Sequence, residues 1–125
     1  MLNAIQDKLM GVVRSGEYIL GPEVDALEKT LATSLGYAHA VGVASGTEAL
    51  ILALKAIGVK PDDEVITPAF SFVASTNVIP WAGAKPVFAD VDPDTACVTA
   101  ESVYRVLTPK TKAIIAVDLY GRQAP

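Results

Sequence analysis

The sequence contains a single cysteine, Cys97, which excludes an internal disulfide and a metal site built from several cysteines. It has no run of basic residues, and its formal charge of −4 argues against a nucleic-acid partner. No apolar stretch reaches the roughly 20 residues that a membrane-spanning helix needs, and the chain does not begin with a secretion signal. We therefore expect a cytoplasmic protein without membrane or nucleic-acid partners.

Hydrophobic residues are abundant, at 51% of the 125 residues. A small domain buries a smaller fraction of its surface than a large one, so a chain of this length cannot cover all of these side chains by itself. We expect the remaining apolar surface to pack against a second subunit or against a further part of a longer protein.

Segments with helical spacing of apolar residues alternate with short apolar runs that have no polar alternation. This pattern predicts a parallel sheet that is covered by helices on both faces. The predicted elements are helices at residues 2–13, 22–35, 47–57, 73–81 (kinked or ended by Pro80) and 100–107, strands at 40–44, 65–66, 86–89 and 112–117, and a turn at 92–95.

The sequence Ser45-Gly46-Thr47-Glu48 lies between the first predicted strand and a helix. The first N–H groups of a helix have no internal acceptor, and the helix dipole adds a partial positive charge, so this junction suits a phosphate. Gly46 lets the ligand approach the backbone, and the Thr47 hydroxyl can also donate. The lysine of a P-loop and the glycine spacing of a dinucleotide fingerprint are both absent. A junction that only turns and caps the chain is the structural alternative.

Three segments follow predicted strands, and we expect them to meet at one edge of the sheet. They are Ser45–Thr47, Pro68–Phe72 and Asp118–Tyr120. In open sheets of this class, ligands bind beyond the carboxyl ends of the strands. The topology therefore predicts a site at this edge.

Four other side chains have simpler structural explanations. His39, the only histidine, lies in strand-like surroundings, where we expect a hydrogen-bonded structural role. Asp90 and Asp92 flank a Pro-Asp turn, which favours a turn-forming role over paired catalytic carboxylates or a metal site. Cys97 follows the same turn with no nearby partner to activate it as a nucleophile. We assign no metal ligand and no catalytic residue in this chain.

Five separated blocks form a recognisable series: Gly16–Val24, Ser45–Leu50, Glu64–Ile79, Gly83–Asp92, and Thr108–Ile115 with Leu119–Gly121. In this order and over nearly the whole chain, they resemble the DegT/DnrJ/EryC1/StrS family of pyridoxal-phosphate-dependent sugar aminotransferases. The resemblance implies an α/β fold with a three-layer, mostly parallel sheet: the amino-terminal part of the large domain of a fold-type-I transferase. Within residues 1–125, it implies a helical arm and loop at 1–36 and alternating strands and helices at 37–125.

The resemblance also implies which residues hold the cofactor. Gly46 and the backbone N–H groups of Thr47 and Glu48 would bind its phosphate, with the Glu48 carboxylate pointing away because two anions repel. Phe72 matches the position whose aromatic side chain stacks on the cofactor ring, whereas its spacing alone favours a core aromatic.

Two further positions are less defined by the resemblance. Asp118 stands where many family members have histidine, so its contact with substrate is open. The loop that carries Tyr18 reaches the neighbouring subunit's site in relatives, and an exposed surface aromatic is the alternative.

Family members are roughly three times as long as this chain, well above a typical single domain. The family blocks that hold the Schiff-base lysine and the aspartate on the cofactor's ring nitrogen are not in these 125 residues. None of Lys55, Lys85, Lys110 and Lys112 lies in the family's serine-x-x-lysine context. We therefore expect these residues alone to catalyse no amino transfer.

The implied function of the parent enzyme is amino transfer from an amino acid, with glutamate as the expected donor, to a nucleotide-linked keto-sugar, in a homodimer with pyridoxal 5'-phosphate as cofactor. Two alternatives stay open. One is a sugar dehydratase of the same family, which replaces the Schiff-base lysine. The other is a non-catalytic fragment that only folds and dimerises.

Overall fold

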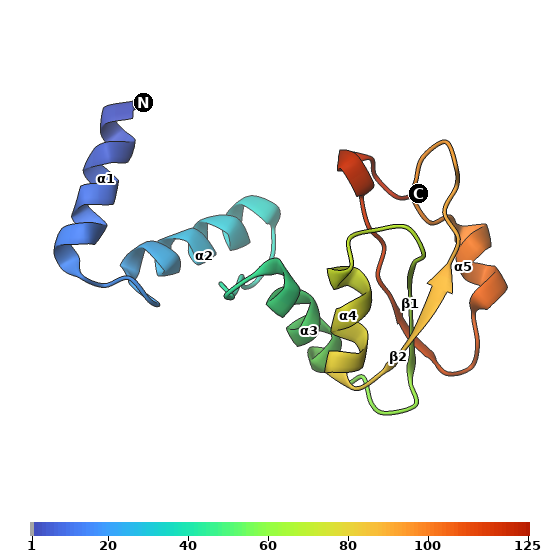
Figure 1. The fold of residues 1–125 in the computed structure, drawn as a ribbon. Helices are drawn as coiled ribbons and strands as arrows, with labels where there is room; N and C mark the ends of the chain where they lie inside the picture. The colour runs from blue at the N-terminus through green and yellow to red at the C-terminus, as the bar shows by residue number, and fades with distance from the viewer. Residues whose placement is uncertain (1) are drawn as a thin grey trace. The chain divides into compact units, whose positions relative to one another are not determined.

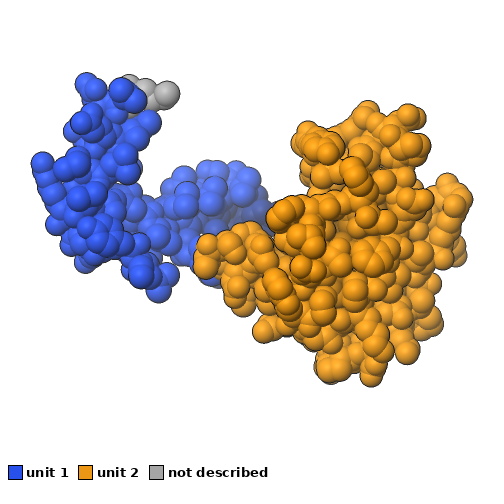
Figure 2. Space-filling view, in the orientation of Figure 1, with its two compact units in different colours: residues 1–42 blue, residues 43–125 orange. Residues whose placement is uncertain are grey.

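The computed structural model describes residues 2–125. The chain forms two compact units, residues 1–42 and 43–125, which Figure 2 colours blue and orange. Within the described residues, no helix combines the length and apolar character that crossing a membrane requires.

The first unit consists of two helices and their connecting segments. Helix α1 spans Leu2–Ser15 and α2 spans Pro22–Leu35. Pro22 suits the first turn of α2, where a backbone N–H would have no helical acceptor. Gly36 ends α2 with φ 72°, a left-handed conformation that glycine adopts without strain. Among the described residues of this unit, Ala32 is the only buried hydrophobic one, so the apolar stripes of both helices lie exposed within the unit.

The second unit is an α/β structure with a three-stranded parallel sheet in the order β2-β1-β3. In this sheet Glu64 on the central strand pairs with Lys85 on one side and Thr111 on the other. The parallel pairing confirms the predicted fold class. The elements are α3 Gly46–Ala56, β1 Glu64–Pro68, α4 Ala74–Ala82, β2 Lys85–Ala89, α5 Ala100–Val106, β3 Thr111–Ile114 and the short 3₁₀ helix η1 Leu119–Gly121.

The two faces of the sheet carry separate apolar cores. The chain passes from β1 to β2 on one side of it and then to β3 on the other side. Both connections are expected to be right-handed, and because they run in opposite directions across the sheet, α4 and α5 lie on opposite faces. Figure 1 shows α3 and α4 on one side of the strands and α5 on the other. Val65 packs with α3 and α4, and Ile66 packs toward α5. Successive residues of a strand point to opposite faces, so each of these two fully buried side chains serves one core.

The prediction of a strand at 40–44 is wrong, because no described segment forms a ladder with these residues. Gly42 instead donates its N–H to Glu28 Oε1 on α2 at 2.5 Å. A Cβ at position 42 would lie 3.2 Å from both Glu28 Oε1 and Val24 Cγ1, so this close approach to α2 favours glycine.

Smaller differences concern the ends of elements. β3 ends at Ile114 rather than residue 117, although the Ile115 N–H still bonds to the Ile66 carbonyl at 2.8 Å. Helix α4 continues two residues beyond Pro80 and ends at Gly83, whose φ of 99° stops the helix. The missing Pro80 N–H removes one helical bond, and a bond lost this close to the helix end has little effect on the turn that follows.

Candidate functional site

The carboxyl edge of the sheet is formed by the segments that leave β1 and β3. The chain continues from β1 into Ala69–Val73 and from β3 through Ile115 into η1. In Figure 1 the β2 arrow points toward the top of the view, where both segments lie, and β1 and β3 are parallel to β2. The structure thus confirms that Pro68–Phe72 and Asp118–Tyr120 share one edge of the sheet. Ser45–Thr47 follows no strand, so the reason for expecting it at the same edge is wrong.

The start of α3 has the geometry of an anion site. Ser45 is extended, with φ −162° and ψ 165°, and its side-chain oxygen accepts the Glu48 N–H at 3.1 Å. The first helical bond runs from the Ala49 N–H to the Ser45 carbonyl at 3.0 Å. The N–H groups of Gly46 and Thr47 therefore have no acceptor within the helix. Because the Ser45 oxygen accepts a bond, its own proton remains available for an anion.

Neither the backbone conformation nor the packing at position 46 requires glycine. Its φ is outside the left-handed region, and a Cβ built on it would have no atom within 4 Å. The space beside the free N–H groups is therefore open, and a side chain at this position would take part of it. The absence of a side chain at Gly46 leaves room for a ligand to approach the backbone.

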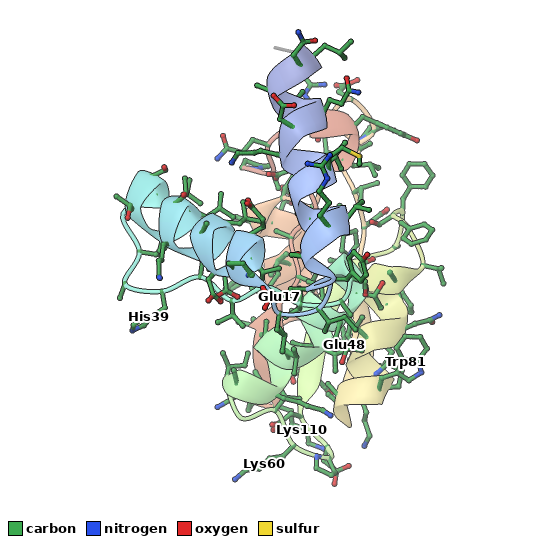
Figure 3. The ribbon with its side chains drawn as sticks, turned by 90° about the vertical axis from the view of Figure 1, so that its left-hand side faces the viewer. Glu17, His39, Glu48, Lys60, Trp81 and Lys110 are labelled. Carbon is green, nitrogen blue, oxygen red and sulfur yellow. The ribbon has the colours of Figure 1, made fainter. Side chains whose placement is uncertain are left out.

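The backbone N–H of Glu48 is less available to a phosphate than the sequence predicts. Its N–H is already bonded to Ser45, so it can serve a phosphate only as a shared donor. The residue is exposed on the first turn of α3, where Figure 3 labels it, and water can hydrate its carboxylate. Binding of cofactor by Gly46, Thr47, Glu48 and Phe72 remains a prediction.

Phe72 lies at the carboxyl edge, between β1 and α4. Its side chain is 74% exposed, which does not fit the alternative of a core aromatic within this chain. Its carbonyl accepts the Ser75 side chain at 2.8 Å and the Ser75 N–H at 3.1 Å, which fixes the backbone of Phe72 to the start of α4. The ring is thus held on an ordered turn and is free to contact a ligand.

Asp118 and Tyr120 lie at the same edge, after β3. The Asp118 carboxylate accepts the Ala124 N–H at 2.9 Å, which occupies one of its oxygens. Tyr120 has φ 55° and is 87% exposed. The neighbouring Arg122 donates from Nη1 to the Asp94 carbonyl at 2.7 Å. This bond links the segment after η1 to the turn at 92–95, and the sequence pattern did not predict it.

The turn at residues 92–95 is structural, as predicted. The Asp92 carboxylate accepts the N–H groups of Asp94 at 3.0 Å and Thr95 at 2.9 Å. The bond from the Thr95 backbone is the main cause that lowers the pKa of Asp92. Cys97 is fully buried, and its thiol donates to the Arg122 carbonyl at 3.4 Å. The Cys97 thiol is therefore not accessible to a ligand, and the Asp92 carboxylate holds the turn together.

None of the four candidate lysines has the surroundings of a Schiff-base lysine. Such a lysine must be desolvated so that its amine is neutral, yet Lys55, Lys85, Lys110 and Lys112 are all exposed. The pKa of Lys85 is raised by its hydrogen bond and charge interaction with Asp62, which favours the protonated form. Figure 3 shows Lys110 at the opposite end of the second unit from the carboxyl edge.

Tyr18 and His39 belong to the first unit. The Tyr18 hydroxyl donates to the Val13 carbonyl at 3.0 Å, and its ring is exposed. His39 is exposed, and within the described residues its side chain makes no hydrogen bond, so the structural role expected for it is not observed.

Comparison with known proteins supplies the family. A family model described as the DegT/DnrJ/EryC1/StrS aminotransferase family matches residues 1–125. The chain is 46% identical over 124 residues to a UDP-2-acetamido-2-deoxy-3-oxo-D-glucuronate aminotransferase from Pseudomonas aeruginosa, covering 96% of this chain and 34% of that protein. It is 37% identical over 120 residues to a 3-oxo-glucose-6-phosphate:glutamate aminotransferase from Bacillus subtilis, covering 96% and 27%.

Solved structures agree in fold. The crystal structure of NtdA from Bacillus subtilis with bound cofactor PMP superposes with a TM-score of 0.90 at 36% identity, covering 98% of this chain and 28% of NtdA. This chain therefore spans about a third of the length of the relatives that it matches.

Aminotransferases of this family use pyridoxal phosphate, which confirms the cofactor expected from the sequence. The described residues fit the phosphate end of this group, because two free N–H groups at the start of α3 face a space that a Cβ at Gly46 would enter. They also offer an exposed aromatic ring, Phe72, at the carboxyl edge of the sheet. The match over all 125 residues, the identity to named aminotransferases and the agreement in fold lead to one conclusion: the chain belongs to the DegT/DnrJ/EryC1/StrS aminotransferase family.

Proposed function

We propose that this chain is the amino-terminal portion of the large cofactor domain of a sugar aminotransferase. In this proposal the enzyme transfers an amino group from glutamate to a keto-sugar linked to a nucleotide. The observation that carries it is the start of α3, where free N–H groups of Gly46 and Thr47 face open space. That geometry lies within a chain 46% identical to an aminotransferase named for a UDP-linked 3-oxo-sugar.

The residues of this chain would have two tasks. The N–H groups of Gly46 and Thr47, with the hydroxyls of Ser45 and Thr47, would hold the cofactor phosphate against the dipole of α3. Phe72 would lie against the cofactor ring and exclude water from that face. When bound, pyridoxal phosphate supplies the carbonyl group that takes up the amino group and returns it. The lysine and the ring-nitrogen carboxylate would come from outside these 125 residues.

The glutamate donor and the nucleotide are the finer parts of the proposal. A relative named for glutamate as donor supports the first, but its named sugar is a phosphate rather than a nucleotide. The greater identity to the protein named for a UDP-linked sugar favours the nucleotide.

We also propose that the enzyme is a cytoplasmic homodimer. Exposed apolar side chains on α1, α2 and the segment 70–81 would supply a dimer interface. An unpaired, buried Cys97 is compatible with a reducing compartment.

The proposal is tested with the full-length protein and added pyridoxal phosphate. Glutamate is supplied with a UDP-linked 3-keto-sugar in one assay and a 3-keto-sugar phosphate in another, and products are identified by mass spectrometry. We expect the UDP-linked amino sugar as the main product. Transfer only to the sugar phosphate would reject the nucleotide, and loss of a hydroxyl without amino transfer would identify a dehydratase.

A further inference from the structure

Tyr120 combines three properties that the fold of this chain does not explain. Its backbone is left-handed, with φ 55° and ψ 24°, a conformation that glycine and asparagine adopt far more readily than tyrosine. Its side chain is 87% exposed, so no packing within the described residues holds it there. Gly121 follows with φ 79°, so the turn already contains a residue suited to this conformation. A second left-handed residue at a tyrosine is therefore a strained choice.

The turn around Tyr120 is held firmly by its neighbours. The Gly121 N–H donates to the Asp118 carbonyl, and the Arg122 N–H donates to the Leu119 carbonyl, both at 3.1 Å. Beyond the turn, the Arg122 side chain bonds to Asp94 at 2.7 Å, and the Ala124 N–H bonds to the Asp118 carboxylate at 2.9 Å. None of these bonds uses the Tyr120 side chain. The surroundings thus fix the backbone and leave the phenol free.

The position of the turn indicates what the phenol contacts. η1 follows β3 at the carboxyl edge of the sheet, the edge that also carries the Ala69–Val73 segment with Phe72 (Figure 1). Ligands of open parallel sheets bind beyond this edge. A phenol offers both an apolar face for the C–H groups of a sugar ring and a hydroxyl that can donate or accept.

We propose that Tyr120 is a substrate-binding residue that contacts the sugar of the keto-sugar substrate. This inference rests on the proposed function and adds to it a residue that is not among those proposed to hold the cofactor. Backbone strain at this residue is maintained because the turn presents the phenol to the substrate. The competing explanation is that Tyr120 only packs against another part of the full-length protein.

The test compares Tyr120→Phe, Tyr120→Gly and wild type in the full-length protein loaded with cofactor. Tyr104→Phe is the matched control, because Tyr104 is also exposed, at 79%, but lies on α5. The readouts are KM and kcat for the UDP-linked 3-keto-sugar, its dissociation constant by calorimetry, and the melting temperature without substrate.

We expect Tyr120→Phe to raise KM and the dissociation constant about 3- to 10-fold with little change in kcat, as for one lost hydrogen bond. Tyr120→Gly should weaken binding further while the melting temperature stays equal or rises, since glycine relieves the left-handed strain. Tyr104→Phe should match wild type.

A lower melting temperature of Tyr120→Gly with unchanged KM would overturn the inference and identify a packing residue. Wild-type values of KM and dissociation constant in both Tyr120 variants would overturn it as well. If the wild-type enzyme neither binds nor converts any keto-sugar, the proposed function fails and the inference fails with it. If the wild-type enzyme converts the keto-sugar and the Tyr120 variants behave like it, only the inference about Tyr120 fails.

Discussion

The hydroxyl oxygen of Ser45 accepts the backbone N–H of Glu48 at 3.1 Å and so caps α3. A polar side chain in this position satisfies one of the N–H groups that every helix leaves without an acceptor. Thr99 caps α5 through the Ser102 N–H at the same distance. Within residues 2–125, α3 and α5 are thus both capped by a hydroxyl oxygen, and at α5 the Ser102 hydroxyl also accepts the Thr99 N–H. Only the cap of α3 adjoins the proposed phosphate site.

These two caps should differ in their response to an anion. Ser45→Ala and Thr99→Ala should each lower the free energy of unfolding by about 0.5–2 kcal/mol. The Ser45 hydroxyl also donates to the phosphate in the proposed site, so Ser45→Ala should bind pyridoxal phosphate less tightly, and saturating cofactor should enlarge its deficit relative to wild type. The deficit of Thr99→Ala should not change. Denaturant unfolding with and without cofactor measures both, and an equal response of the two variants would contradict the site.

Adding a methyl group at Gly46 should separate binding from stability. A Cβ there meets no atom of the chain, so Gly46→Ala should leave the melting temperature equal or higher. The methyl group enters the space proposed for the phosphate, and we expect affinity for pyridoxal phosphate to fall about 10-fold. Gly11→Ala is the control, because a Cβ added to Gly11 on α1 also meets no atom within 4 Å. Unchanged affinity in Gly46→Ala, measured by absorbance titration, would place the phosphate elsewhere.

The central strand and the edge strand β3 predict different effects of shortening an isoleucine side chain. Ile66 on β1 is fully buried, whereas Ile114 on β3 is 49% exposed. Ile66→Ala should lower the free energy of unfolding by about 2–5 kcal/mol through lost burial and a cavity. Ile114→Ala should lower the free energy of unfolding by clearly less, because the Ile114 side chain keeps much of its contact with water in the folded state. Denaturant unfolding of both variants decides this, and equal losses would mean that β3 is more enclosed than in this structure.

The ion pair between Asp62 and Lys85 predicts a pH dependence. Nζ and Oδ1 are 2.6 Å apart, and this bond lowers the pKa of Asp62 below 3.8 and raises that of Lys85 above 10.5. The Asp62 contribution is present above its unfolded pKa and is lost as pH falls through its folded pKa. The Lys85 contribution is complete below 10.5 and is lost as pH rises through its folded pKa.

Asp62→Asn is the suitable variant for this pair, because asparagine tolerates the φ of 75° at this position. Both partners are largely exposed, so the effect should be small and should weaken in high salt. We expect the variant to lose less melting temperature than wild type between about pH 6 and pH 3 at low salt. Identical losses would show that the pair does not contribute to stability.

The exposed stripe of α1 predicts self-association. Ile5, Leu9 and Val13 recur at helical spacing, and all three are more than half exposed. Leu9→Glu should weaken association at micromolar concentration in sedimentation velocity, because an interface would have to bury the new charge. Asn3→Glu, away from the stripe, should not. A wild-type monomer would contradict the expected dimer.

The helices, β1 and β2 are predictable from the sequence, because their apolar spacing is unambiguous. The strand expected at residues 40–44 is absent because a strand depends on a neighbour to pair with, and the apolar character of these residues does not supply one. β3 is shorter than its apolar run for a related reason: Ala116 and Val117 continue the run but not the pairing.

Less of the site is predictable from residue types. The small and hydroxyl residues at the start of α3 locate the site, but the capture of the Glu48 N–H by Ser45 depends on side-chain geometry. The exposure of Phe72 depends on which way the turn after β1 faces. The left-handed backbone of Tyr120 is not predictable, since tyrosine has no preference for it.

The central place of β1 has a consequence for how the chain folds. Its two partners, β2 and β3, both come later in the sequence, so β1 leaves the ribosome before either can pair with it. Val65 and Ile66, which are fully buried in the folded chain, therefore remain exposed until these later segments have been synthesised. Such long-range pairing slows folding and leaves an aggregation-prone segment open in the meantime. Hydrogen exchange during refolding should accordingly protect β1 only once β2 and β3 have joined it.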